Sequence, residues 1–295
     1  MATLVHIHSP GGNSLSADQK ESILVANLAK LPSLIVALSG GADSAYLAWA
    51  AHKSMGSLSL SVTALSPSFS AHDRAMLEEF VRKTGVRQEF IETHEMENPA
   101  YRANAADRCY FCKDELFSAL DILAQQRHFA AVAYGVNSDD ALDVRPGHRA
   151  ATEHQVLTPL LDAGLGKSEI RALSERAGLP TWDRPASACL ASRVPYGTEV
   201  TPERLALIER GEAALRQLGF RQFRVRLYHD LARVEIALDE MSCAFAPGMF
   251  STIAHQLKIA GFRDVTLDPK GYRQGSLNEA LAQPAAPAVK AAAGT

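Results

Sequence analysis

The chain carries an apolar strand that runs directly into a glycine turn, and this join constrains the fold most. Residues 34–38 read Leu-Ile-Val-Ala-Leu, and Ser-Gly-Gly-Ala-Asp-Ser follows at 39–44. Five consecutive apolar residues before such a turn indicate a strand buried on both faces, as in a parallel sheet. Gly40 and Gly41 permit backbone conformations that let amide groups close on a ligand. A predicted helix at 45–54 follows, and because a helix N-terminus favours negative charge, the join predicts a cradle for a phosphate chain.

The residues of this turn exclude two common phosphate loops. A Walker A loop needs G-x-x-x-x-G-K-[ST] and a dinucleotide fingerprint needs G-x-G-x-x-G, and neither spacing is present. An ordinary Gly-Gly turn is the remaining alternative. The hexapeptide resembles the PP-loop of the ATP pyrophosphatases, which split ATP between its α and β phosphates and adenylate an acceptor. The resemblance implies that Ser39, Gly40, Gly41, Asp43 and Ser44 bind ATP, with Asp43 placing Mg²⁺ or the leaving pyrophosphate.

Helical and strand-like segments alternate over the first two thirds of the chain. Predicted helices cover 17–30, 45–54, 71–84, 107–126 and 167–177, and predicted strands cover 34–38, 58–65, 86–91 and 129–136. This order predicts an α/β fold, a Rossmann-like domain with a parallel sheet between helices. Ligands of such sheets bind beyond the carboxyl ends of the strands, so the loops after Leu38, Leu65, Ile91 and Val136 should face one pocket.

A second region begins near residue 200. A predicted helix at 202–218 precedes strands at 223–228 and 232–238, a helix at 250–260 and a strand at 265–267. We therefore expect a PP-loop domain at 17–199 and a small α+β domain at 200–279. Residues 280–295 are rich in Ala and Pro without a core-forming pattern, which predicts a disordered tail.

The bulk composition excludes some classes of partner. The chain has 30 basic and 33 acidic residues, so its charge does not favour binding to nucleic acid or to an anionic membrane. It contains no apolar run long enough to span a membrane and no visible signal peptide. Four cysteines in 295 residues do not form a disulfide framework, so we expect a cytoplasmic protein whose cysteines serve chemistry or metal binding.

Three of the four cysteines stand in settings that indicate chemistry. Cys109 and Cys112 open a predicted helix that Asp107 could cap, and a helix N-terminus beside basic residues should favour the thiolate. Such a CxxC pair suits a redox couple, half a zinc site or part of an iron–sulfur site. Cys189 follows small residues that leave its sulfur approachable, and Arg193 could hold an anion. Cys243 has apolar neighbours and is expected in the core.

Several motifs together resemble the LarE sulfur transferases. Besides the loop at 39–44, they are Arg108-Cys-Tyr-Phe-Cys-Lys113, Gly135-Val-Asn-Ser-Asp-Asp140 with Arg145-Pro-Gly147, Ala188-Cys-Leu-Ala-Ser-Arg193, Tyr196-Gly-Thr-Glu199, Phe223-Arg-Val-Arg226 and Gly271-Tyr-Arg-Gln-Gly-Ser276. The resemblance spans roughly residues 17–278. It implies MgATP-dependent adenylation of a carboxylate of pyridinium-3,5-biscarboxylic acid mononucleotide and its conversion to a thiocarboxylate, in assembly of the nickel-pincer nucleotide cofactor.

The resemblance also implies roles for individual residues. Cys189 matches the cysteine that supplies sulfur in sacrificial members and ends as dehydroalanine, and it acts with Asp43 and Arg193 in catalysis. Arg193, Arg224 and Arg226 are implied to bind the substrate, although the two strand arginines could also form a solvated strand edge. This chain has two further cysteines, and we expect Cys109, Cys112 and Cys189 to ligate a [4Fe-4S] cluster whose open iron carries sulfide. A sacrificial Cys189 beside an incidental CxxC is the alternative.

Other functions remain open at this level. A PP-loop tRNA thiolation enzyme would use the same loop and cluster, but it predicts a basic face that the balanced charge does not favour. Amidation of the NAD or GMP synthetase type has no need of the cysteines. An ATP-binding iron–sulfur sensor without turnover is a reading from another class. The resemblance favours a homo-oligomer that acts on a small nucleotide and contacts other proteins of nickel-pincer cofactor assembly.

Overall fold

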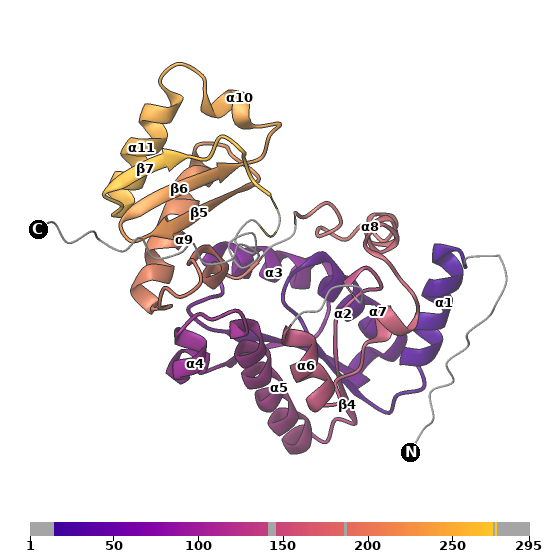
Figure 1. Cartoon of the computed structure of the whole chain (residues 1–295). Coiled ribbons are helices and arrows are strands. Elements are labelled where there is room, and N and C mark those ends of the chain that lie inside the picture. The colour runs from indigo at the N-terminus through magenta and orange to yellow at the C-terminus, as the bar shows by residue number, and fades with distance from the viewer. Residues whose placement is uncertain (1–14, 141–145, 186–187, 274, 276–295) are drawn as a thin grey trace, which may run out of the picture.

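The computed structural model describes residues 15–140, 146–185, 188–273 and 275, and the predicted tail at 280–295 lies outside these residues. Within them the chain builds two sheets, each with its own helices (Figure 1). None of the described helices is both long and apolar enough to cross a membrane.

The first sheet is entirely parallel and has the strand order β3-β2-β1-β4. Its strands are β1 (Leu34–Ala37), β2 (Ser59–Leu65), β3 (Gln88–Glu92) and β4 (Ala131–Tyr134). Leu34 on β1 aligns with Ser59 on one side and Ala131 on the other. All four residues of β1 are buried, as the unbroken apolar run predicts for a central parallel strand.

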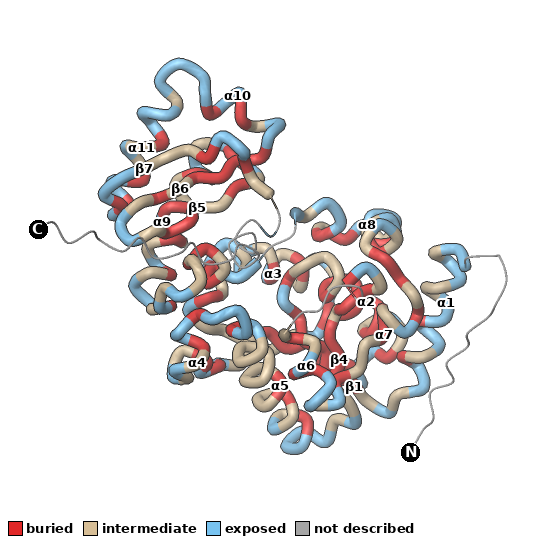
Figure 2. Tube along the Cα trace, in the orientation of Figure 1, coloured by how far each residue is buried: buried red, intermediate tan, exposed pale blue. Residues whose placement is uncertain are grey.

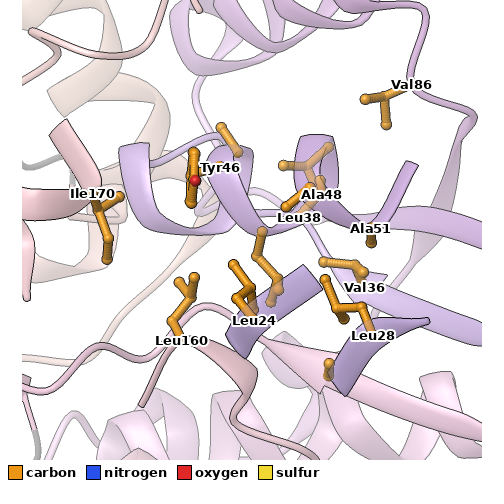
Figure 3. Packing of buried hydrophobic residues seen from close by; sticks show 14 of the residues in the cluster. Leu24, Leu28, Val36, Leu38, Tyr46, Ala48, Ala51, Val86, Leu160 and Ile170 are labelled. Carbon is orange, nitrogen blue, oxygen red and sulfur yellow. The ribbon is translucent and has the colours of Figure 1, made fainter. Parts of the chain in front are cut away.

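Helices cover both faces of this sheet, because successive side chains of a strand point to opposite sides. The helices are α1 (Ala17–Leu28), α2 (Ala42–Met55), α3 (Ala71–Thr84), α4 (Pro99–Arg102), α5 (Arg108–Arg127), α6 (Pro146–Glu153), α7 (Pro159–Asp162) and α8 (Lys167–Arg176). Val36 packs with α1, α2 and α8 (Figure 3), in a cluster that also contains Leu34, whereas Ile35 and Ala37 pack with α5 and α6. Figure 2 shows the buried residues gathered along these strands and the helix faces against them.

The second sheet is small and mixed. Its strands β5 (Phe223–Tyr228) and β6 (Leu231–Ile236) are antiparallel, and β7 (Asp264–Leu267) runs parallel to β6. The helices α9 (Pro202–Gln217), α10 (Met241–Ala244) and α11 (Met249–Ala260) accompany it. Thr201 caps α9 through Arg204 N, with Pro202 in the first turn, which fits the predicted start of this helix.

The predicted fold class is confirmed: an α/β unit with a parallel sheet precedes a small α+β unit. The predicted domain boundary near residue 200 stays a prediction, because the core of the second unit also takes in Tyr101, Leu190 and Val194. The expectation for Cys243 is wrong. Met241 and Ala244 on the same short helix are buried, but Cys243 points outward and is exposed.

Candidate functional site

The carboxyl ends of the first sheet open onto a cavity of about 810 Å³. The loops after β1, β2 and β3 and the segment after β4 line it, as predicted for a parallel sheet. The second unit closes one side of the cavity with Gln222 and Tyr272. Both halves of the chain therefore shape a single site.

The loop at residues 39–44, which we call the phosphate loop, is held in shape by its own hydrogen bonds. Ser39 N donates to Ser44 Oγ at 3.2 Å, the two serine hydroxyls are 3.0 Å apart, and Ser44 Oγ lies 3.1 Å from Gly41 O. Gly40 has φ +78°, which favours glycine. No side chain caps α2 at Gly41, so the first amide groups of this helix remain open to an anion.

Strand β4 ends in direct contact with this loop. A Cβ atom at Gly135 would lie 2.7 Å from Ser44 N and 2.8 Å from Ser44 Cα. Both are backbone atoms of the first turn of α2 and cannot move aside independently. Only glycine at 135 lets β4 support the phosphate loop this closely.

Asp43 lies in a network of polar side chains. Asn137 Nδ2 donates both to Asp43 Oδ2 at 3.1 Å and to Asp140 Oδ2 at 2.9 Å, and Lys167 Nζ pairs with Asp140 Oδ1 at 2.9 Å. Burial raises the pKa of Asp43; the Asn137 hydrogen bond opposes this shift and nearby Asp140 adds to it. The two carboxylates present oxygen ligands of the kind that Mg²⁺ prefers.

Sequence reasoning missed several charged residues on the cavity wall. Lys113, Lys167, Arg171 and Arg184 all line it. Arg184 contacts the phosphate loop directly, with one guanidinium nitrogen 2.5 Å from Gly40 O. Lys113 adjoins Cys112 in the sequence, which offered a local signal, whereas nothing near Arg184 indicates a contact with a glycine 144 positions away.

The structure brings two of the three predicted ligand cysteines to the cavity. Cys112 and Cys189 line it, and Cys109 is exposed on the same helix turn as Cys112. Burial, and then the neighbouring Cys189, raise the pKa of Cys112 to about 12. Burial therefore works against the thiolate that the sequence predicts at Cys112, and it outweighs the opposing charge of Lys113. Asp107 precedes α5, but its side chain makes no capping hydrogen bond.

Arg108 is the buried cation among these thiols. It donates to Asn104 Oδ1 at 2.6 Å and to Ala191 O at 2.8 Å, and it lies 3.9 Å from Cys109 Sγ. Burial opposes its charge, but Cys189 and then Cys109 more than compensate and raise the pKa of Arg108. Among the described residues, no three His, Cys, Asp or Glu side chains stand together as ligands for a metal ion.

Arg193 is a buried residue that supports the backbone at Cys189. It is 3% exposed, forms a two-pronged ion pair with Glu212 at 2.8 and 3.1 Å, and donates to the carbonyls of Ala188 and Cys189 at 2.5 and 3.0 Å. It is not among the residues that line the cavity. Its role in binding substrate stays a prediction, whereas its contacts fix the backbone that carries Cys189.

The two strand arginines are not at a solvated edge. Arg226 is 5% exposed, pairs with Glu235 at 2.9 Å and donates to Ser192 O at 2.6 Å. Arg224 stacks 4.8 Å from the ring centre of Tyr272, which lines the cavity. Arg226 therefore also supports the backbone after Cys189, and Arg224 supports the cavity wall.

No protein-family model matches the chain, but three known proteins align with parts of it. It is 39% identical over 252 residues to the uncharacterized protein slr1717 of Synechocystis sp., covering 85% of this chain and 94% of that protein. It is 33% identical over 263 residues to the pyridinium-3,5-bisthiocarboxylic acid mononucleotide synthase of Lactiplantibacillus plantarum, covering 89% and 95%. The uncharacterized protein MJ0830 of Methanocaldococcus jannaschii matches at 31% over 170 residues, covering 58% and 66%.

Proposed function

The chain belongs to the LarE family of sulfur transferases, and from that membership we propose that it activates a carboxylate with ATP and replaces a carboxylate oxygen by sulfur. The proposed substrate is pyridinium-3,5-biscarboxylic acid mononucleotide, because the synthase of Lactiplantibacillus plantarum is named for the corresponding bisthiocarboxylic acid. One observation carries the proposal: the phosphate loop, Cys112 and Cys189 face a single cavity. A phosphate site and a sulfur site that share one cavity suit adenylation followed by sulfur transfer.

In the first step the phosphate loop binds ATP. We propose that backbone amides of Gly40, Gly41 and the uncapped start of α2, with the hydroxyls of Ser39 and Ser44, hold the phosphate chain. Asp43 would hold Mg²⁺, which neutralises charge on the phosphates. A carboxylate oxygen of the substrate attacks the α phosphorus, the bond to the β phosphate oxygen breaks, and pyrophosphate leaves.

In the second step sulfur displaces AMP from the acyl adenylate. Adenylation turns a poor electrophile into one with a good leaving group. If Cys189 is the donor, its sulfur bonds to the acyl carbon and AMP leaves. Loss of the Cys189 Cα proton and cleavage of the Cβ–S bond then release thiocarboxylate and leave dehydroalanine.

A [4Fe-4S] cluster held by Cys109, Cys112 and Cys189 is the preferred source of sulfur in our proposal. The donor set suits it: two of the thiols line the cavity, and Cys109 lies on the same helix turn as one of them. Such a cluster would supply an open iron able to carry sulfide, which would spare Cys189. Arg108, already adjacent to Cys109, places a positive charge beside the ligands.

The pyridinium nucleotide would occupy the part of the cavity next to the second unit. Tyr272 and Gln222 form that wall, and Arg224 stacks on Tyr272. We propose that Arg224, behind this wall, and Arg193 and Arg226, against the turn that carries Cys189, favour the anionic groups of the substrate. The family resemblance also favours a homo-oligomer in contact with other proteins of nickel-pincer cofactor assembly.

Substrate-dependent cleavage of ATP tests this function. Purified protein is incubated with MgATP and with the dicarboxylate nucleotide, with unfractionated tRNA, or with neither, and AMP and pyrophosphate are quantified. We expect equal amounts of AMP and pyrophosphate only with the dicarboxylate. Cleavage stimulated by tRNA would instead support tRNA thiolation, and ATP binding without any cleavage would support a sensor.

A further inference from the structure

Arg184 joins the phosphate loop to the start of α3. Its side chain is 9% exposed. One guanidinium nitrogen lies 2.5 Å from Gly40 O, and the other forms an ion pair with Asp73. A mostly buried cation held between a backbone carbonyl and a carboxylate is fixed in both position and direction.

The contact at Gly40 O determines where the next amide points. The described residues contain no cis peptide bond, so the carbonyl of Gly40 and the N–H of Gly41 point in opposite directions. Because Arg184 holds the carbonyl, the Gly41 N–H faces the other side. There it meets Ser39 Oγ at 3.5 Å, the long limit of a hydrogen bond, so a stronger acceptor can take it.

A glycine pair leaves this peptide free to turn over unless something holds it. Gly40 at φ +78° and Gly41 at φ −72° lack the side chains that would fix one orientation. In the reversed orientation a carbonyl oxygen would face the phosphates and repel them. On the basis of the proposed ATP site, we propose that Arg184 is a positioning residue that locks the Gly40–Gly41 peptide with its N–H toward the phosphate chain.

Neighbouring contacts hold Arg184 itself. Asp73 also accepts from Ser70 Oγ at 2.6 Å, and Ser70 caps α3 by accepting from Asp73 N. The backbone carbonyls of Arg184 and Trp182 accept from Arg171 of α8 at 2.6 and 3.0 Å. The guanidinium is thus oriented by α3 and its backbone by α8, which leaves little freedom for the Gly40 carbonyl.

Binding of inorganic pyrophosphate and of AMP to Arg184→Ala, Arg184→Lys and Asp73→Asn tests the lock. We expect Arg184→Ala to weaken pyrophosphate binding roughly 10- to 100-fold, as for a lost hydrogen bond to a charged group. AMP binding should change less than about threefold, because AMP lacks the β and γ phosphates that the loop holds. Arg184→Lys, which keeps one donor, and Asp73→Asn should show smaller losses. Arg74→Ala is the control, because Arg74 lies next to Asp73 on α3 but its ion pair with Glu78 is exposed.

A second readout follows the Gly41 amide in the wild type and in Arg184→Lys. The Gly41 amide resonance should move on pyrophosphate titration, and this movement should be reduced in Arg184→Lys. Equal pyrophosphate affinity in Arg184→Ala and Arg74→Ala, equal losses for AMP and pyrophosphate, or a Gly41 amide that does not respond would each overturn the lock. Wild-type protein that binds pyrophosphate but makes no thiocarboxylate would refute the proposed function and leave the lock standing.

Discussion

The phosphate loop and the turn that carries Cys189 (residues 188–193) serve one cavity but are held in different ways. The loop keeps its shape mainly through neutral hydrogen bonds among Ser39, Gly41 and Ser44, all within five positions, and Arg184 adds a charged contact at Gly40 O. The Cys189 turn rests on charged contacts from Arg193 and Arg226, whose carboxylate partners belong to α9 and β6. Leu190 N also donates to Ser68 O at 2.9 Å, which ties the turn to the loop after β2.

This difference separates the two halves of the proposed reaction. A loop built mainly from local contacts depends on its own sequence, on the close approach of β4 and on the contact from Arg184. A turn held by buried ion pairs depends on the whole second unit, because a buried charge that loses its partner is strongly destabilising. ATP binding and sulfur transfer should therefore fail separately when each support is removed.

The largest expected effect follows removal of the carboxylate under the Cys189 turn. Glu212→Ala leaves the buried Arg193 without its partner, and we expect the free energy of unfolding to fall by about 3–5 kcal/mol, with sulfur transfer lost. Arg216→Ala is the matched control, because it removes only the outer, 28% exposed partner of Glu212. Urea unfolding measures the stability of both variants. A loss below about 1 kcal/mol for Glu212→Ala would contradict this account of the turn.

The same ion pair predicts how stability depends on pH. Burial alone would raise the pKa of Glu212, but Arg193 overrides it and the pKa lies below its usual value. The pair therefore contributes fully above the ordinary glutamate pKa, and its contribution is lost as the pH falls through the depressed value. Urea unfolding from pH 7 down to pH 3 should show this loss in wild type. A wild-type slope no steeper than that of Glu212→Ala would refute it.

Gly135→Ala is expected to have the next largest effect, on the phosphate loop instead. The added Cβ would meet backbone atoms of Ser44, so the loop must shift, at a cost of about 1–3 kcal/mol. Isothermal titration should show weaker ATP binding. Iodoacetamide labelling of Cys189 should stay as in wild type, since the turn has separate supports. Altered labelling of Cys189 together with unaltered ATP binding would show that Gly135 supports the Cys189 turn and not the phosphate loop.

The smallest effect is expected from Asn137→Ala. Asn137 holds the pKa of Asp43 down against burial and Asp140, so its loss should raise that pKa further. Since the ionised form of Asp43 would bind Mg²⁺, the acid limb of the pH–rate profile should move to higher pH. We expect roughly tenfold lower kcat/KM at pH 6 and less change at pH 8. An acid limb that does not move would contradict the role of Asp43 as a ligand of Mg²⁺.

The sequence predicted the fold and the strand–turn–helix geometry around the phosphate loop, because both depend on short-range patterns. The apolar run at 34–38 and the glycines after it encode a central strand and its turn within eleven residues. The partners of Arg193 and Arg184 could not be predicted from the sequence, since only tertiary packing brings Glu212 and Gly40 to them. The raised pKa of Cys112 and the exposure of Cys243 likewise depend on how deeply the folded chain buries each residue. The neighbouring residues in the sequence do not show this.

Mass spectrometry of product and protein after one incubation tests the central claim most directly. Anaerobically reconstituted protein, with sulfide, receives MgATP and the dicarboxylate nucleotide, and the Cys109→Ser/Cys112→Ser variant runs beside it. We predict a thiocarboxylate product with an unchanged Cys189 in wild type, and dehydroalanine at 189 or no product in the variant. Consumption of ATP without any sulfur in the product, in either protein, would contradict sulfur transfer as the function of this cavity.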